Sequence, residues 1–434
     1  MSKATAAKAK PAPAIPLAET KEAGGHSKYY EWLINSWIFI PVLVYFKMVN
    51  QYALNLPIGD DYNAVLQFLN NFKTAAFSDK FGLLLQQHNE HRILSSRFIF
   101  LLYNTIAGNI NFINLIFIAN LQLVIIFIAA ILFIKKAIPK YWNITALMVG
   151  FCIFDMNNYD NADFAMCGMQ NYGVIMLFML SLLFYSYDNR KYIIPAILCQ
   201  IICIYSSGNG MIAAFVLVLF TVFIRDRKRI ISSVVTFLIF TPLYFIHYTK
   251  AADQSTYSND LSKIVPFYLH LAGGHFGYEI GVVAGVLMFI VLALVLPISK
   301  KNHIKENALP FLSILVFILV SNAVVSVFRS NVKMLDSYSS RYLIYPNMLA
   351  AIAFVLIMIK IDGYKFKWPV TIGVSLLFLY TYSQNYTYGE AGFERYQYRT
   401  QNQEYYFPAE RVGEARDIAN KSCQLGIYCI QNER

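Results

Sequence analysis

Eleven apolar stretches, separated by short polar segments, constrain this 434-residue chain more than any other feature of its sequence. Single hydrophobic cores stop growing at roughly 250–300 residues, so one or two soluble cores cannot hide this much apolar surface. Only 14% of the residues are charged, whereas a soluble domain carries about 25%. The sequence therefore predicts an all-α polytopic membrane protein with about 11 transmembrane helices. The apolar stretches lie at residues 32–56, 112–134, 138–154, 171–187, 192–206, 209–224, 230–248, 276–298, 308–328, 342–360 and 368–384.

Several of these stretches are shorter than the ~20 residues that an upright helix needs to cross a bilayer. Backbone at membrane depth has to be hydrogen-bonded, so we expect some helices to be broken or sheltered by their neighbours. The resulting organisation is a flexible cytosolic tail at 1–31, a transmembrane domain at 32–384 and a periplasmic C-terminal tail at 385–434.

Charged residues lie between the apolar stretches and assign an orientation to them. With the N-terminus inside, most Lys and Arg fall on the cytoplasmic side, the second and third outer loops contain none, and carboxylates concentrate outside. This distribution follows the positive-inside rule. The net charge of +11 is therefore a topological signal and does not indicate a nucleic-acid-binding surface.

The first outer loop, residues 57–97, is long and amphipathic. It contains helix-length pieces at 61–77 and 79–97, in which apolar residues such as Val65 and Phe68 are spaced for one helical face. We expect these pieces to lie on the membrane surface.

Cys423 and Cys429 are the two of six cysteines that lie clearly in water on the outer side. An oxidising compartment permits a disulfide between them. Spacing alone does not decide whether it forms, so the pairing stays open.

Two adjacent carboxylates, Asp60 and Asp61, follow the first apolar stretch at the outer membrane boundary. Such a pair can accept a proton in general base catalysis or help to hold a divalent cation. The alternative is a helix N-cap, where an acidic residue accepts backbone hydrogen bonds and complements the helix dipole.

At the other end of the same loop, Glu90, His91 and Arg92 bring together an acid, an imidazole and a guanidinium. On a helix, His88 and Arg92 would share a face because they are four residues apart. The ligand spacing of a zinc hydrolase is absent, so that class of enzyme is not indicated. The alternative is a surface helix with a solvated polar side.

The second outer loop, residues 155–163, contains Asp160, Asn161 and Asp163 and no basic residue, and Gln170 follows it. These side chains suit a cation or the hydroxyl groups of a sugar. A purely solvated loop would be equally acidic, so the pattern alone does not decide between the two.

The third outer loop carries Asn209 between Gly208 and Gly210. Glycine-rich turns are usually tight connectors. At membrane depth, however, exposed backbone has to be sheltered by protein or line a wet cavity, so this loop is also a candidate edge of a site.

Arg341, followed by Tyr342, stands at the outer end of a predicted span. Its planar guanidinium makes bidentate and permanently charged hydrogen bonds, which suit a phosphate group. The alternative is an interfacial anchor that extends to the lipid headgroups.

Together these motifs resemble the GT-C superfamily of polytopic membrane glycosyltransferases, especially bacterial members that use a polyprenyl-phosphate (undecaprenyl-phosphate) sugar donor to modify O-antigen, lipopolysaccharide or other envelope glycans. Similar proteins place an acidic motif in the first outer loop and a long amphipathic segment between spans one and two. The motifs that carry the resemblance are Asp60-Asp61, Asn89-Glu90-His91-Arg92, Asp160-Asn161 with Gly168 and Gln170, Ser207-Gly208-Asn209-Gly210, and Ser340-Arg341-Tyr342.

The resemblance implies a GT-C-like fold in a bacterial inner membrane, with a periplasmic active site. A carboxylate would deprotonate the acceptor hydroxyl and cations would stabilise the leaving phosphate. The residues so implied are Asp60, Asp61 and Glu90 for catalysis, Arg341, Arg92 and His91 for the donor phosphate, and Asp160, Asn161, Asp163, Gln170, Asn209 and Tyr342 for the sugar or acceptor.

A divalent cation, Mg²⁺ or Mn²⁺ at Asp60 and Asp61, is the candidate cofactor. The implied partners are the polyprenyl-phosphate-linked sugar donor, a glycan acceptor, the lipid bilayer, a glycosyltransferase that charges the carrier, and a flippase. No nucleic-acid partner is expected.

Three other functions stay open. A transporter or lipid-linked glycan flippase would also have many spans, but it would place coupling charges near the bilayer midplane. An O-antigen polymerase or ligase would carry arginines in a large late outer loop, whereas 249–275 contains Lys250 and Lys263 as its basic residues. A non-catalytic membrane scaffold would leave the Glu90 to Arg92 motif without a purpose.

Overall fold

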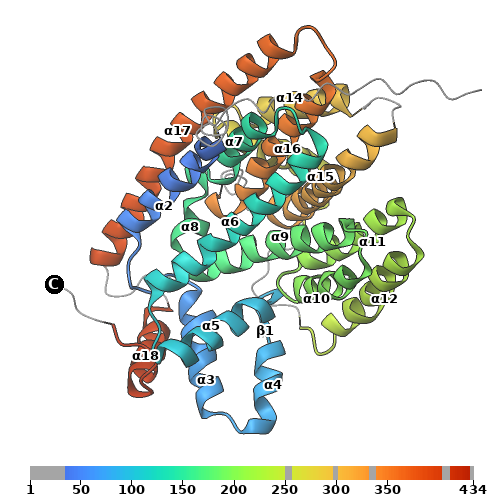
Figure 1. The fold of residues 1–434 in the computed structure, drawn as a ribbon. Helices are drawn as coiled ribbons and strands as arrows, with labels where there is room; N and C mark the ends of the chain where they lie inside the picture. The colour runs from blue at the N-terminus through green and yellow to red at the C-terminus, as the bar shows by residue number, and fades with distance from the viewer. Residues whose placement is uncertain (1–34, 250–256, 297–301, 332–338, 403–410, 431–434) are drawn as a thin grey trace, which may run out of the picture. The chain divides into compact units, whose positions relative to one another are not determined.

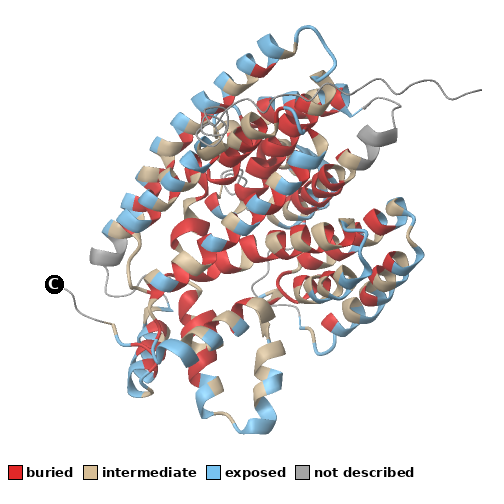
Figure 2. Cartoon of the chain, viewed as in Figure 1, coloured by how far each residue is buried: buried red, intermediate tan, exposed pale blue. Residues whose placement is uncertain are grey.

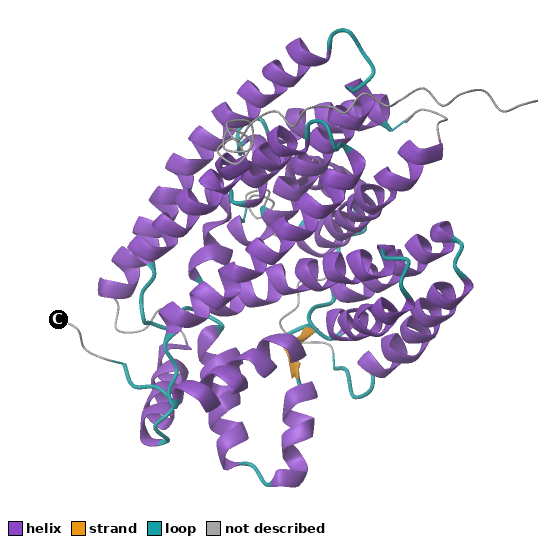
Figure 3. Ribbon diagram, viewed as in Figure 1, coloured by secondary structure: helices purple, strands orange, loops and turns teal. Residues whose placement is uncertain are grey.

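The part of the chain that the computed structural model describes is mostly helical (Figure 1), with one short strand pair (Figure 3). The structure describes residues 35–249, 257–296, 302–331, 339–402 and 411–430, so the predicted tail at 1–31 lies outside the described residues. Residues from Ile38 onward belong to one unit. The elements are η1 (Trp37–Phe39), α2 (Ile40–Tyr52), η2 (Tyr62–Gln67), α3 (Phe68–Thr74), α4 (Phe77–Leu85), β1 (Gln87–His88), β2 (His91–Arg92), α5 (Leu94–Ala107), α6 (Phe112–Ala137), α7 (Trp142–Ile153), η3 (Met156–Asn158), α8 (Tyr159–Asp163), α9 (Ala165–Ser186), η4 (Arg190–Tyr192), α10 (Ile193–Ile204), α11 (Asn209–Ile224), α12 (Arg227–Tyr244), α13 (Leu261–Gly273), η5 (Gly274–Phe276), α14 (Gly281–Val295), α15 (Asn302–Arg329), η7 (Ser340–Tyr342), α16 (Ile344–Ile361), α17 (Lys367–Asn402) and α18 (Val412–Gln424).

Among the described residues, four helices are long and apolar enough to cross a membrane. They are α6, α9, the part of α15 from Asn307 to Arg329, and the segment Ser340–Ile361, which contains η7 and α16. The segments Leu261–Phe276 and Gly281–Val295 pass the same test together, but the chain bends by 86° between them. The all-α membrane fold is therefore confirmed. The prediction of about 11 spans is wrong, because the structure supports four, or five with the bent pair.

Helix length explains part of the difference in the number of spans. Each predicted apolar stretch contains a helix, but α2 has 13 residues and α7 and α10 have 12 each. These helices are shorter than the ~20 residues that cross the hydrocarbon core. Hydropathy records where the chain is apolar, whereas turns and bends decide how far a single helix extends.

The burial pattern fits a helical unit surrounded by lipid. Buried residues gather on the inner faces of α6, α9 and α16 (Figure 2), and the Ser340–Ile361 span is 89% buried. Large apolar side chains are exposed on the outer helices, including Leu198 of α10, Phe223 of α11 and Leu294 of α14. Many exposed large apolar side chains on the outer helices are typical of contact with a membrane.

The first outer loop departs from the predicted pair of helices. The predicted helix at 79–97 is wrong, because α4 ends at Leu85 and an antiparallel hairpin follows before α5. Asn89 turns the chain with a φ of +48°, a left-handed conformation that Asn tolerates better than most residues. The hairpin pairs Gln87 with Arg92 and His88 with His91, so His88 and Arg92 do not share a helical face.

The downstream segment docks on the first outer loop. The helix α17 continues past the predicted boundary at 384 to Asn402, and α18 packs on η2 and α3. Asn70 Nδ2 donates to the Ile418 carbonyl at 3.1 Å, and Tyr428 Oη donates to the Asn55 carbonyl at 2.8 Å. The two segments therefore lie side by side (Figure 1).

A disulfide joins Cys423 and Cys429 and closes the end of α18. This answers the question that the sequence left open. Closing so short a loop removes conformational freedom from the unfolded chain and stabilises the docked segment by about 2 kcal/mol in the chain-entropy model.

We predict that Cys423→Ser lowers the stability of the docked α18 segment by about 2 kcal/mol. Limited proteolysis and thermal unfolding in detergent would measure this loss, and a reductant should reproduce it in the wild-type protein. Cys199→Ser, which removes a free cysteine of α10, is the control. Equal protease sensitivity of the Cys423→Ser and Cys199→Ser proteins would contradict the prediction.

Candidate functional site

A polar cavity of about 380 Å³ lies where the loops predicted on the outer side meet. It collects residues from the hairpin, the start of α9, the third outer loop, the end of α15 and η7. Five predicted site residues line it: Glu90, His91, Gln170, Asn209 and Tyr342. The structure therefore brings together side chains that are up to about 250 positions apart in the sequence, as bundle packing of the outer loops allows.

The hairpin and the third outer loop fix His91 in the wall of this cavity. The backbone N–H of Gly208 donates to His91 Nδ1 at 3.2 Å, so in a neutral ring Nε2 carries the proton. Burial lowers the pKa of His91, with Glu90 acting against this effect and Arg329 adding to it. His91 is therefore a neutral hydrogen-bond donor at physiological pH.

The third outer loop is both a tight connector and an edge of the cavity. A Cβ atom at Gly210 would lie 1.8 Å from the Cys203 carbonyl oxygen, so no side chain fits there. Ser207 and Asn209 nevertheless line the cavity, and Asn209 Nδ2 donates to Tyr345 Oη at 2.7 Å. The tight turn sets the direction of the polar side chains beside it.

Arg329, the last residue of α15, also lines the cavity and was not among the predicted site residues. It is the permanently charged cation among the lining residues. The signal in the sequence is the same as for Arg341, because both arginines stand at the outer end of an apolar stretch. Arg329 gives the cavity a group that attracts an anion.

Asp160 and Arg341 form a second polar cluster beside the cavity. Asp160 Oδ2 accepts from the backbone N–H of Arg341 at 3.2 Å, and Tyr396 Oη donates to Asp160 Oδ1. Burial raises the pKa of Asp160, and the Tyr396 hydrogen bond and the Arg341 charge oppose that rise. The Arg341 side chain is exposed, with its guanidinium carbon 5.6 Å from the centre of the Tyr342 ring. Asp60 is half-buried and interacts electrostatically with Arg341.

Asn161 connects this cluster with the cavity. Its amide nitrogen donates to the Arg341 carbonyl at 2.8 Å, and its amide oxygen accepts from Asn171 Nδ2 at 2.7 Å. Asn171 lines the cavity. A Cβ at Gly168 would lie 2.2 Å from the Asn161 carbonyl oxygen, so glycine permits this close approach of α8 to α9.

Two predicted site acids lie in the protein interior and do not line the cavity. Asp61 is 1% exposed and accepts from the backbone N–H groups of Ile58 at 3.1 Å and Met166 at 2.9 Å. The second bond satisfies a free N–H group in the first turn of α9, whereas Asp61 makes no capping bond to the helix that follows it, so the capping alternative for that local junction is wrong. Asp163 is also buried, and its Oδ1 has no hydrogen-bond partner among the described residues. Burial raises the pKa of Asp61 to about 8 and that of Asp163 well above its ordinary value.

Arg92, a predicted phosphate ligand, is buried and binds backbone carbonyl groups. It donates to the carbonyls of Leu85, Tyr244 and Ile246. Arg97 lies beside it and donates through Nη1 to Leu83, at 2.9 Å, and to Leu84 and Gln86. Both guanidinium groups thus satisfy the free carbonyls at the C-terminal end of α4 and complement its dipole. Burial and the charge of Arg92 lower the pKa of Arg97 to about 10.

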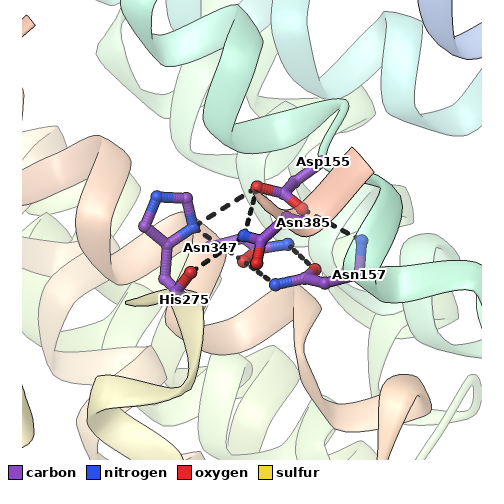
Figure 4. Close-up of polar contacts among 5 residues, drawn as sticks. All are labelled: Asp155, Asn157, His275, Asn347 and Asn385. Carbon is purple, nitrogen blue, oxygen red and sulfur yellow. Dashed lines mark hydrogen bonds and ion pairs between the residues drawn. The ribbon is translucent and has the colours of Figure 1, made fainter. Parts of the chain in front are cut away.

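A second buried network lies deeper in the unit (Figure 4). His275 Nδ1 is 3.0 Å from Asn347 Oδ1 and 3.6 Å from Asp155 Oδ2. Asn347 and Asn157 exchange amide hydrogen bonds at 2.8 and 3.2 Å, and Asn385 Nδ2 donates to Asp155 Oδ2 at 2.9 Å. Burial raises the pKa of Asp155 to about 7. The network joins the bend after α13 to η3, α16 and α17.

The described residues contain no group of three or more His, Cys, Asp and Glu side chains placed to hold a metal ion. The Asp61 carboxylate accepts hydrogen bonds from the backbone N–H groups of Ile58 and Met166. Asp60 instead interacts electrostatically with Arg341. Comparisons with models of known protein families and with curated protein sequences found no match. The chemistry of the site therefore follows from its own residues.

We predict that Arg97→Ala loosens α4 by about 1.5–3 kcal/mol, because hydrogen bonds from a charged donor to buried carbonyls are lost. Hydrogen exchange of the amides at 77–86 should become at least roughly tenfold faster. Arg190→Ala removes an exposed arginine of η4 and should leave that exchange unchanged. Unaltered exchange in Arg97→Ala would show that α4 is held by other contacts.

We also predict that stability falls as the pH rises above about 4, the ordinary pKa of Asp. The raised pKa values of Asp61 and Asp163 mean that the folded state binds more protons than the unfolded state in this range, so the loss continues through about pH 8 for Asp61. Asp163→Asn should flatten this dependence in thermal unfolding between pH 5 and 8. Asp417→Asn, at an exposed position of α18, should not. Identical pH profiles of both variants would contradict the assignment.

Proposed function

We propose that the chain is a GT-C-like membrane glycosyltransferase that moves a sugar from a polyprenyl-phosphate carrier to an acceptor hydroxyl on the periplasmic face of a bacterial inner membrane. The observation that carries this proposal is the polar cavity, in which Glu90, His91 and Arg329 line one space. A carboxylate and a cation in one cavity supply the base and the anion site that such a transfer needs.

In the proposed reaction, the acceptor oxygen forms a bond to the anomeric carbon of the donor sugar. The bond from that carbon to the phosphate oxygen breaks, and its electron pair stays on the phosphate. The acceptor proton moves to the Glu90 carboxylate. Direct displacement inverts the anomeric centre, and no covalent intermediate on the enzyme is required.

Arg329 would stabilise the leaving phosphate, with the exposed Arg341 guanidinium as a second cation at the edge of the site. A fixed guanidinium costs no reorganisation when the negative charge develops, which makes this type of stabilisation a large share of catalysis. His91 would donate a hydrogen bond from Nε2 to the same phosphate or to the sugar.

Amide and hydroxyl groups would orient the sugar. Gln170, Asn171, Asn209 and Tyr342 line the cavity with donors and acceptors that match sugar hydroxyls. Asp160 and Asn161 would support them through the bonds to Arg341 and Asn171.

The reaction places constraints on its neighbours in a pathway. One enzyme must attach the sugar to the carrier, and a flippase must present the charged carrier on the outer face. The carrier-charging enzyme and the flippase are therefore proposed partners. A divalent cation is not needed for the steps above, because the arginines supply the positive charge.

We predict that Glu90→Gln lowers sugar transfer by roughly 10²–10⁴-fold, because the amide cannot accept the acceptor proton. Arg329→Gln should lower it by roughly 10²–10³-fold through loss of charge at the leaving phosphate. The assay uses the purified protein in proteoliposomes with polyprenyl-phosphate sugars and outer-envelope lipid extract, and mass spectrometry of the product.

Glu279→Gln is the matched control, since Glu279 is exposed in the bend before α14 and should retain full transfer. Full activity of both the Glu90→Gln and Arg329→Gln proteins would sink the site assignment. Movement of a lipid-linked glycan across the bilayer without any transfer would favour the transporter alternative.

A further inference from the structure

Two junctions between helices, the one from α6 to α7 and the one from α16 to α17, are rich in lysine and have no part in the proposed sugar transfer. Together they contain six lysines and one acidic residue, Asp362. The lysines are Lys135, Lys136, Lys140, Lys360, Lys365 and Lys367. Positive charge is therefore concentrated at these junctions without a matching number of carboxylates.

The length of α16 separates this region from the polar cavity. Tyr345, in the first turn of α16, lines that cavity, and Lys360 lies in the last turn of the same helix. The 18 residues of α16 extend about 27 Å at 1.5 Å per residue, which is close to the ~30 Å thickness of a hydrocarbon core. The lysines therefore lie at the membrane boundary opposite the polar cavity, at the level of the lipid headgroups.

Lys140 and Lys367 converge on the side chain of Tyr141. Their ammonium nitrogens lie 5.4 Å and 5.2 Å from the centre of the Tyr141 ring. Both lysines donate hydrogen bonds to the Tyr141 hydroxyl group, and these bonds, the Lys367 bond foremost, lower the pKa of Tyr141. Neither lysine belongs to an ion pair in the part of the chain that the structure describes. Two positive charges thus share one phenol and lack an anion that would balance them.

Aromatic and apolar residues place these lysines at the edge of the lipid-facing surface. Trp368 packs edge to face on Tyr141, with the ring centres 5.4 Å apart, and is 52% exposed. Lys135 Nζ lies 4.0 Å from the centre of the Trp142 ring. Exposed apolar side chains follow within about one helical turn, at Leu132 of α6 and Ile372 of α17. Tryptophan and tyrosine at such a border are typical of the headgroup region of a bilayer.

We propose that Lys140 and Lys367 bind the phosphate of an anionic lipid headgroup, with Lys135 as a third cation beside them. The lipid phosphate supplies the negative charge that the two ammonium groups lack. The acyl chains of the same lipid pack on the exposed apolar surface at Leu132 and Ile372, a contact that a soluble anion does not make. This site lies in the leaflet opposite the polar cavity and does not depend on the proposed glycosyltransferase function.

Native mass spectrometry of the full-length protein in detergent, titrated with phosphatidylglycerol or phosphatidylcholine, tests the proposal. The wild-type protein should retain phosphatidylglycerol in preference to phosphatidylcholine, and higher ionic strength should weaken this preference. Lys140→Gln combined with Lys367→Gln should weaken binding of the first phosphatidylglycerol roughly thirtyfold, the factor for loss of two charges at a lipid surface. Lys140→Arg combined with Lys367→Arg preserves both charges and should retain binding.

The matched control is Arg190→Gln combined with Lys191→Gln. It removes the same charge from two exposed residues of η4, and Lys191 Nζ also lies beside a tyrosine, 5.1 Å from the centre of the Tyr192 ring. This control should keep its phosphatidylglycerol. Equal weakening in the control and in the glutamine pair would reduce the effect to total positive charge and overturn the proposal.

Three further outcomes would also overturn it. Equal retention of phosphatidylglycerol and phosphatidylcholine would show that the headgroup charge is not recognised. Displacement of phosphatidylglycerol by an equal concentration of inorganic phosphate would assign the lysines to a soluble anion. Loss of binding in the arginine pair, which keeps both charges, would show that altered packing causes the loss in the glutamine pair.

Discussion

The need to pair buried polar groups inside the protein shapes much of this structure. A helical unit surrounded by lipid has no water to complete such bonds, and an unpaired group costs several kcal/mol. The second outer loop meets this need by bonding to distant helices: Asn157 pairs with Asn347, Asn158 with Tyr172, and Asn161 with the Arg341 carbonyl. This loop, whose composition left a ligand site and a solvated loop both open, is largely a buried junction.

The two buried arginines extend the same principle to the first outer loop. The positively charged guanidinium groups of Arg92 and Arg97 are buried. The backbone carbonyl groups at the end of α4 accept their hydrogen bonds and so offset the cost of burying the charge. Because α4 is held at its C-terminal end, the hairpin that follows has a fixed position in the wall of the polar cavity.

The sequence was informative where polar motifs interrupt apolar stretches, and less so where geometry decides the outcome. Glu90, His91, Gln170, Asn209 and Tyr342 were found because polar residues at membrane boundaries stand out, and they do meet in one cavity. The sequence could not distinguish the roles of adjacent residues with similar chemistry. Asp60 is half-buried, whereas Asp61 is buried and accepts a hydrogen bond from the first turn of α9. Tertiary packing sets this difference. The left-handed turn at Asn89 replaced a predicted helix, and short helices and a bend replaced predicted spans. Arg329 was missed because nothing local distinguishes it from an interfacial anchor.

The docking of α18 on the first outer loop has a consequence for biogenesis. Asn63 and Glu414, whose side chains are 3.0 Å apart, are separated by 351 positions in the chain. At a synthesis rate of roughly 5–20 residues per second, the loop waits about 20–70 s for its partner. During that interval the surface that will receive α18 is uncovered. Docking of α18 on this loop is thus a late event of synthesis, and the Cys423–Cys429 bond can close only after both of these late residues have been made.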